Sequence, residues 1–319
     1  MDSGNQLHDW LQLVRLFAEG EDGLPYYATA LVCVGGVLGA ILAAYFLIGR
    51  LFHVRLSRHA TFTPVDGSED NVPAVQYAAA SHPLLQELRK TFGLTDVAGD
   101  GSDFTRLVRV MNWVHGLTTH ARNPSHPERI TGLHLAKLAQ QGKRINCWMY
   151  SIILNDAILA LGIPSRIIHL LPPKKSPGES HVVITFYCRD LRRWVMLDAD
   201  MNGFVTDEDG APLGVREIRR RIVDRRPLRV SDSVHMKGVS FLRRGIRKRL
   251  YLWYLSKNIF RMSCPMQSEP DYETAASGRR YLQLIPDDYN DEWLSVPRRT
   301  SAGNEIRYTR DEDAFWQAP

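Results

Sequence analysis

The chain has 319 residues, of which 44% are hydrophobic and 24% are charged, and its formal net charge is +5. These values are those of an ordinary globular protein with one sizeable core plus extensions. The four cysteines include no Cys-x-x-Cys pair, which argues against a zinc knuckle, and no glycine-rich loop suited to phosphate is present.

The first segment with a clear pattern is 26–48, which follows an acidic flank at 1–25. Its 23 residues carry no charge, which is enough for a helix to cross about 30 Å of hydrocarbon. Tyr26, Tyr27 and Tyr45 suit the two membrane interfaces. We predict one N-terminal transmembrane helix; a buried core helix is the alternative. The run is too long for a cleaved signal peptide.

The orientation of this helix is predicted from the basic residues beside it. Arg15 precedes the apolar run, whereas Arg50, Arg55 and Arg58 follow it closely. By the positive-inside rule the C-terminal part then lies in the cytoplasm. We therefore expect a single-pass protein of the cell membrane, with its catalytic domain in the cytoplasm.

A polar, proline-containing linker, 49–80, leads to a predicted core domain at 81–235. Residues 81–141 are expected to be mostly helical, because Pro83 suits a helix start and apolar residues recur at helical spacing from Leu84 and again from Phe104. These helices are expected to pack against the helix that follows them.

Cys147 is the most informative residue, because it stands in the first turn of a mostly apolar helix that ends near Gly162 and Pro164. The free N–H groups and the partial positive charge at a helix N-terminus favour a thiolate. The backbone N–H of Cys147 itself is the expected donor to an oxyanion.

A predicted strand follows at 165–171. After a loop comes a predicted hairpin, with strands at 181–187 and 193–198. If its turn is centred on residues 189 and 190, His181 and Asp198 lie directly opposite each other on one face. A carboxylate there can hold one imidazole nitrogen and leave the other for a thiol. A turn shifted by one residue would place Asp200 opposite His181 instead, so spacing leaves both acids open.

Four blocks of residues, in this order, resemble the transglutaminase-like superfamily. They are Asn-Cys-Trp at 146–148, Leu-Gly-Ile-Pro-Ser-Arg at 161–166, the strand that opens with His181, and Trp-Val-Met-Leu-Asp at 194–198. The resemblance implies an α+β, papain-like transglutaminase core, with helices packed on an antiparallel sheet. It also implies that Cys147 is the nucleophile, His181 the general base and Asp198 the orienting acid.

The resemblance implies a cysteine enzyme that acts on peptide or side-chain amides through a thioester. Hydrolysis is slightly preferred, and transfer to an amine is the alternative. A non-catalytic module that binds peptides in the same groove is the competing hypothesis. The chain departs from the family at 182–183 and 199–200, where it has Val-Val and Ala-Asp. The expected partner is a protein or peptide substrate, with no cofactor; the oligomeric state is not predicted.

Other polar residues are interpreted as structural. Gln141 lies where papain-like proteases place an oxyanion donor, but it is better explained as the end of the preceding helix. His115, His120 and His126 fit no zinc motif and are read as solvent-exposed or packing residues, so no metal is expected. Trp148 and Trp194 are read as core packing.

The C-terminal part, 236–319, is predicted to be a basic helix and an extension packed on the core. Between 213 and 262 there are 15 basic and 3 acidic residues, whereas 263–319 has 11 acidic and 6 basic ones. The basic segment can lie on an anionic membrane, or its charges can meet the acidic tail. No nucleic acid is expected, because no recognised binding module accompanies the charge.

Overall fold

The computed structural model describes residues 31–43, 56, 61–64, 72–173, 180–235, 242–289 and 297–319. The chain forms two compact units, Met1–Leu51 and Phe52–Pro319.

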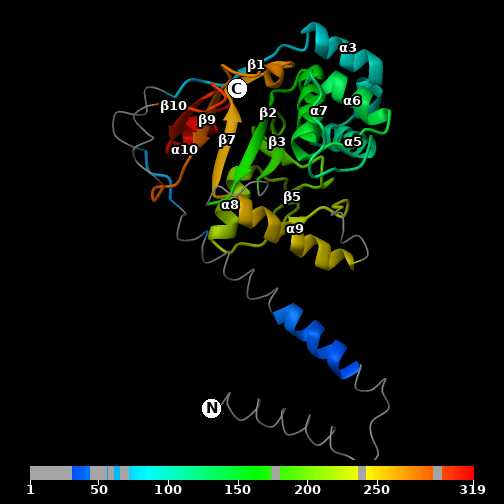
Figure 1. Ribbon diagram of the computed structural model, residues 1–319, viewed down its shortest axis with the longest axis vertical. Helices are drawn as coiled ribbons and strands as arrows, with labels where there is room; N and C mark the ends of the chain where they lie inside the picture. The colour runs from blue at the N-terminus through cyan, green and yellow to red at the C-terminus, as the bar shows by residue number, and fades with distance from the viewer. Residues whose placement is uncertain are drawn as a thin grey trace, which may run out of the picture. The chain divides into compact units, whose positions relative to one another are not determined.

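In the first unit, residues 31–43 form a helix, blue in Figure 1, whose side chains are exposed. The predicted transmembrane segment, 26–48, extends beyond this helix at both ends, and its other residues lie outside the described part of the chain. Within the residues described, no helix is both long enough and apolar enough to cross a membrane. The membrane-spanning helix therefore stays a prediction.

The second unit is built on a sheet of seven strands, in the order β10-β11-β9-β7-β2-β3-β4 (Figure 1). Neighbouring strands are antiparallel except β9 and β11, which are parallel. The strands are β2 (Ser165–Leu171), β3 (His181–Cys188), β4 (Arg193–Leu197), β7 (Arg261–Pro265), β9 (Arg280–Leu284), β10 (Arg298–Arg299) and β11 (Glu305–Thr309). The C-terminal part of the chain thus adds four strands to the sheet that the predicted core begins.

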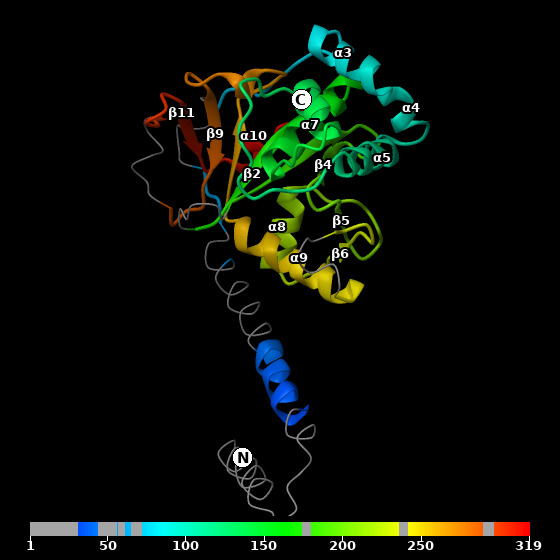
Figure 2. The same ribbon diagram turned by 45° about the vertical axis from the view of Figure 1, so that its right-hand side comes forward.

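Helices cover both faces of this sheet (Figure 2). One face carries α3 (Pro83–Phe92), α4 (Leu94–Ala98), α5 (Asp103–Gly116), α6 (Gly132–Gln140) and α7 (Cys147–Ala160). The other carries α8 (Val215–Val223), α9 (Arg244–Asn258) and the short α10 (Glu312–Phe315). Small two-stranded sheets join β1 (Gln76–Tyr77) to β8 (Gln267–Ser268) and β5 (Val205–Thr206) to β6 (Arg229–Val230), and a 3-10 turn, η2, spans Tyr272–Thr274.

The two faces follow from the alternation of side chains along each strand. Ile167 of β2 and its partner Ile184 of β3 belong to the core beneath α3–α7. The next pair, Ile168 and Val183, belongs to the core beneath α8 and α9. Because both faces are covered, these strands are apolar almost without interruption.

The C-terminal tail is fastened to the sheet through Arg166 of β2. This arginine is 1% exposed, and its guanidinium donates to the backbone oxygen of Phe315 at 2.7 Å. The same group lies over the ring of Trp194, 4.6 Å from its centroid. Cation–π contact is strongest when water is excluded, so this arginine links three segments distant in sequence.

Charges of the basic segment meet acids of the tail at α8. Arg216 contacts Glu312 and Asp313, and Arg220 contacts Glu312. In α9, by contrast, Tyr251 and Leu255 are fully buried, so one face of this basic helix packs on the sheet.

The observed register of β3 and β4 is the shifted alternative, not the one centred on residues 189 and 190. Tyr187 pairs with Trp194 and Cys188 with Arg193, which moves the turn centre one residue toward the C-terminus. The loop at 189–192 is closed by Arg192 at a φ of +52°. Tertiary contacts hold this loop, because the side chain of Arg189 donates to both carboxylate oxygens of Asp103 at the start of α5. A local turn rule cannot anticipate such contacts.

Candidate active site

Cys147 is the first residue of α7 and is half-buried. The helix begins there because Asn146 has an extended backbone and its side-chain oxygen accepts from the Met149 N–H at 3.0 Å. The first-turn amides that remain have no carbonyl of their own helix to bind. Since nearly every later residue of α7 is buried, the thiol stands on a rigid element and has amide donors beside it.

His181 is the first residue of β3, and its side chain is 1% exposed. Its Nε2 donates to Oδ2 of Asp198 at 2.6 Å. The ring of Tyr254 from α9 meets the imidazole edge to face, with centroids 5.0 Å apart. These contacts fix the ring plane and leave Nδ1 as the nitrogen available to a reacting group.

Asp198 follows the last residue of β4 and is completely buried. Its carboxylate also accepts from the Tyr251 hydroxyl at 3.0 Å and from the Met201 N–H at 3.0 Å. The chain leaves the sheet here, since Asp198 forms an isolated bridge with Gly203. Asp198 therefore reaches His181 from a turn, and the cross-strand pairing predicted for these two residues is wrong although their contact is present.

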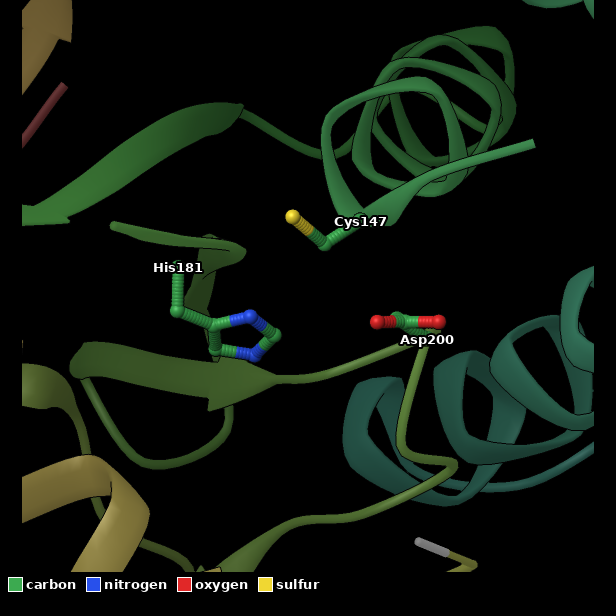
Figure 3. Close-up of side chains that lie close together, drawn as sticks. All are labelled: Cys147, His181 and Asp200. Atoms are coloured by element: carbon green, nitrogen blue, oxygen red, sulfur yellow. The ribbon is translucent and has the colours of Figure 1, made fainter. Parts of the chain in front are cut away.

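Figure 3 shows the Cys147 sulfur on the side of the imidazole that carries Nδ1, with Asp200 across from both. One ligand-type atom from each of the three residues lies within 4.8 Å of the other two. Among the described residues, Nδ1 of His181 is buried and has no hydrogen-bond partner of normal length. The structure thus brings together Cys147, His181 and Asp198, and of the two candidate acids Asp198 bonds His181 while Asp200 lies beside the thiol and the imidazole.

The environment of His181 favours its protonated form. Burial acts against the charge, but the Asp198 carboxylate, with smaller contributions from Tyr254 and Cys147, raises the pKa of His181 well above its usual range. A cationic imidazole beside a thiol stabilises the thiolate.

Asp200 makes a second contact with a histidine. Its Oδ1 accepts from Nδ1 of His120 at 2.8 Å, and the side chains are 3% and 29% exposed respectively. The guanidinium of Arg144 donates twice to the His120 backbone oxygen, which fixes this loop. His120 was read as a solvent-exposed or packing residue, and it instead pairs with an acid of the site, 80 residues away in sequence.

The site opens into a cleft of about 920 Å³. Near the thiol the cleft is lined by Trp148, His120 and Tyr254, and it continues to Glu273 and Arg279. Trp148 is therefore half-buried in the cleft wall, against the ring of His126, rather than fully in the core. Trp194 is buried as predicted.

The remaining sequence candidates lie apart from this cleft. Gln141 is exposed and caps the C-terminus of α6, as its structural interpretation predicted. Cys188 and Cys264 are buried, and Cys33 is exposed on the helix 31–43. His115 lies beside the site, where its Nδ1 contacts the backbone oxygen of Ala199 at 2.9 Å.

Tyr251 and Tyr254 were not predicted as site residues. They lie in a run that sequence reasoning assigned to a basic surface helix. Together with Leu255 they recur at helical spacing on one face of α9, and this periodicity was the signal available.

One comparison with known proteins, a family model, agrees with the resemblance predicted from sequence. Residues 92–199 match the family model of the transglutaminase-like superfamily. A solved structure described as "a Putative Cysteine Protease from Cytophaga hutchinsonii" is similar at 14% identity and a TM-score of 0.29, over 52% of each chain. The chain thus spans about half the length of that structure. No curated protein matches the chain. The match over 92–199 includes Cys147, His181 and Asp198, so the segment that carries these three residues is similar to the transglutaminase-like superfamily, as the sequence resemblance predicts.

Proposed function

We propose that this protein is a cysteine enzyme that cleaves peptide or side-chain amides through a thioester on Cys147. The observation that carries the proposal is the relay from the Cys147 thiol to His181 and from His181 to the buried Asp198. A helix-terminal thiol, an imidazole held in one orientation and a carboxylate behind it are the parts that acyl transfer requires.

In the proposed reaction the Cys147 thiolate attacks the amide carbonyl carbon, and first-turn amides of α7 stabilise the oxyanion. His181 gives its Nδ1 proton to the leaving amine as the carbon–nitrogen bond breaks, which yields a thioester and a neutral imidazole. Water then attacks the thioester while His181 accepts a proton from it, and the acid product leaves with the thiolate restored. Asp198 is a positioning residue, because it orients His181 and stabilises its cation.

Hydrolysis is preferred over transfer to an amine because charged and polar side chains lie in the cleft wall beside the thiol, where they can hold water. Asp200, His120 and Lys257 all line it. An amine acceptor competes with water only where water is excluded. Transfer to an amine is therefore the second candidate, and a peptide-binding module without turnover is the third.

The test compares Cys147→Ala with a matched control, Cys33→Ala, on the full chain. A library of fluorogenic peptide amides and a fluorescent amine-incorporation assay report the two reactions. We expect Cys147→Ala to abolish turnover with little change in melting temperature, and Cys33→Ala to retain it. Turnover that survives in Cys147→Ala would show that the thiol is not the nucleophile. If the wild-type thiol also fails to react with iodoacetamide at neutral pH, the binding module is the better interpretation.

We also propose that residues 26–48 tether the catalytic unit to the cell membrane, with the enzyme on the cytoplasmic side. The uncharged 23-residue run and the exposed apolar side chains of the helix 31–43 support this proposal. The basic face of α9 supplies a second, electrostatic contact, since Arg243, Arg244 and Arg249 are exposed. Carbonate extraction of membranes and protease protection in sealed vesicles test the tether; a chain released by carbonate would refute it.

A further inference from the structure

We infer that Cys147, His181 and Asp200 form a binding site for one Zn²⁺ ion, whose binding reversibly blocks the thiol. The inference deepens the proposed function by naming a regulation of the same site, and it rests on that function only for its inhibitory consequence. Thiolate, imidazole and carboxylate are the three donor types that zinc sites use. The three donors come from different elements, at the start of α7, the start of β3 and the turn after β4 (Figure 3).

The free nitrogen of His181 points to a ligand. Its side chain is 1% exposed, and among the described residues Nδ1 has no hydrogen-bond partner of normal length; Figure 3 shows it on the side of the ring that faces the Cys147 sulfur. Neutral imidazole with a proton on Nε2 keeps its donation to Asp198 and presents the Nδ1 lone pair. Histidine ligands of metals almost always donate their other N–H in this way, so Asp198 would hold the ring of a ligand as it holds a base.

The Asp200 carboxylate is likewise held by a neighbouring residue through one of its two oxygens. Its Oδ1 is held by Nδ1 of His120, which leaves Oδ2 for a cation. Asp200 is nearly buried, whereas His120 is partly exposed toward the cleft, which gives an ion a path of entry. One thiolate and one carboxylate match the charge of a divalent ion, and the neutral imidazole adds a donor without adding charge.

The geometry suits zinc and not the hard cations. A tetrahedral Zn²⁺ with bonds of about 2.0–2.3 Å places its donors roughly 3.5 Å apart. The three donor atoms lie within 4.8 Å of one another, so small side-chain rotations can bring them to this separation. Mg²⁺ and Ca²⁺ require six or more oxygen donors, which this set does not provide. Cys147 and Asp200 line the cleft, so a fourth ligand such as water would come from the cleft.

Bound zinc would use the two electron pairs that the proposed reaction needs. The thiolate pair that attacks the carbonyl carbon and the Nδ1 pair that moves the proton would both be coordinated. The bound ion would therefore inhibit the enzyme, and a chelator would restore it without any covalent change.

The experiment titrates the chelator-treated full chain with zinc chloride by calorimetry. Cobalt substitution then reports a thiolate ligand through its charge-transfer absorption. We expect one zinc per chain in the wild type and loss of the cobalt charge-transfer band in Cys147→Ser. In Asp200→Asn we expect the affinity for zinc to be at least about 100-fold weaker, which exceeds the usual effect of changing a residue that only supports a ligand. The matched control Cys33→Ser should bind like the wild type. Absence of stoichiometric binding, or binding lost in Cys33→Ser and retained in Asp200→Asn, overturns the inference.

The same samples separate this inference from the proposed function. Chelator-treated enzyme that turns over substrate and binds no zinc refutes the site and leaves the function standing. If the protein binds zinc as described but shows no turnover after chelator treatment, the zinc site is supported and the proposed function is refuted.

Discussion

The site contains two histidine–carboxylate pairs that differ in burial and in the number of hydrogen bonds to the carboxylate. His181 and Asp198 are 1% and 0% exposed, and the carboxylate also receives the Tyr251 hydroxyl and the Met201 amide. His120 is 29% exposed, and within the described residues the Asp200 carboxylate receives one hydrogen bond, from His120. The same two side-chain types therefore form one fixed pair and one adjustable pair.

The difference shows what burial contributes to a reactive site. Charge interactions strengthen as water is excluded, and a buried carboxylate requires several donors to remain ionised. The first pair satisfies this requirement and can hold an imidazolium in one orientation. In the second pair only His120 is partly exposed, so solvent screens the interaction from the histidine side and the imidazole can move when a ligand binds.

The largest expected effect comes from Asp198→Asn, which breaks the buried pair without changing its shape. Asparagine cannot stabilise the His181 cation and permits the wrong tautomer. We expect the turnover of a peptide amide to fall on the order of 10³–10⁴-fold. Steady-state kinetics measure the loss, and circular dichroism shows whether the fold is kept. A folded variant that retains more than about a tenth of wild-type turnover would contradict the role of Asp198.

Asp156 sharpens the comparison because it is a buried carboxylate with no histidine beside it. Its Oδ2 accepts from the Gly132 N–H at 2.7 Å, yet burial raises the pKa of Asp156 to about 7. The folded state therefore holds this proton more tightly than the unfolded state, where the pKa is near 3.8. Stability must then fall as pH rises from about 4 to about 7, by about 4 kcal/mol in all.

Asp156→Asn removes this titration and keeps an oxygen that can accept from Gly132. We expect the variant to unfold at a higher urea concentration than the wild type at pH 8, with a stability difference that grows by about 3 kcal/mol between pH 5 and pH 8. Urea unfolding of both proteins across this range measures it, and the contribution of His181 cancels in the difference. A difference independent of pH would show that Asp156 is ionised in the folded protein throughout.

Removal of one hydrogen-bond donor from the fixed pair should have an intermediate effect on stability. Tyr251 is fully buried, and burial together with the charge of Asp198 raises the pKa of Tyr251 well above its usual range, so it remains a hydroxyl donor. Tyr251→Phe deletes its hydrogen bond to the carboxylate. We expect a loss of about 1.5–3 kcal/mol in unfolding free energy. Chemical denaturation measures this loss, and an unchanged midpoint would indicate that the bond contributes nothing net.

The central helix and hairpin could be predicted from sequence because their signals are local. Pro83 and Cys147 begin helices at the residues expected, and β2 spans 165–171 as predicted. Asn146 caps α7, and the alternation in β2 and β3 determines their faces. The contact of His181 with Asp198 was also anticipated, although from an incorrect register.

The parts that could not be predicted depend on long-range contacts. The loop at 189–192 is held by α5, and His120 contacts Asp200 across 80 residues. The sheet is completed by β7, β9, β10 and β11, which the sequence indicates only as an extension. No period or spacing within a segment carries such information. The adjustable pair was therefore missed, whereas the fixed pair was found.

The smallest expected effect is that of His120→Gln, which removes the imidazole from the adjustable pair and keeps a donor for Asp200. Partly exposed ion pairs contribute about 1 kcal/mol or less, and 1.4 kcal/mol corresponds to a tenfold change in rate. We therefore expect turnover of the chelator-treated enzyme to fall by less than about tenfold in His120→Gln, far less than in Asp198→Asn. Steady-state kinetics with the same peptide amide measure the loss of turnover in both variants. Equal losses in the two variants would mean that His120 takes part in proton transfer and that burial does not separate the roles of the two pairs.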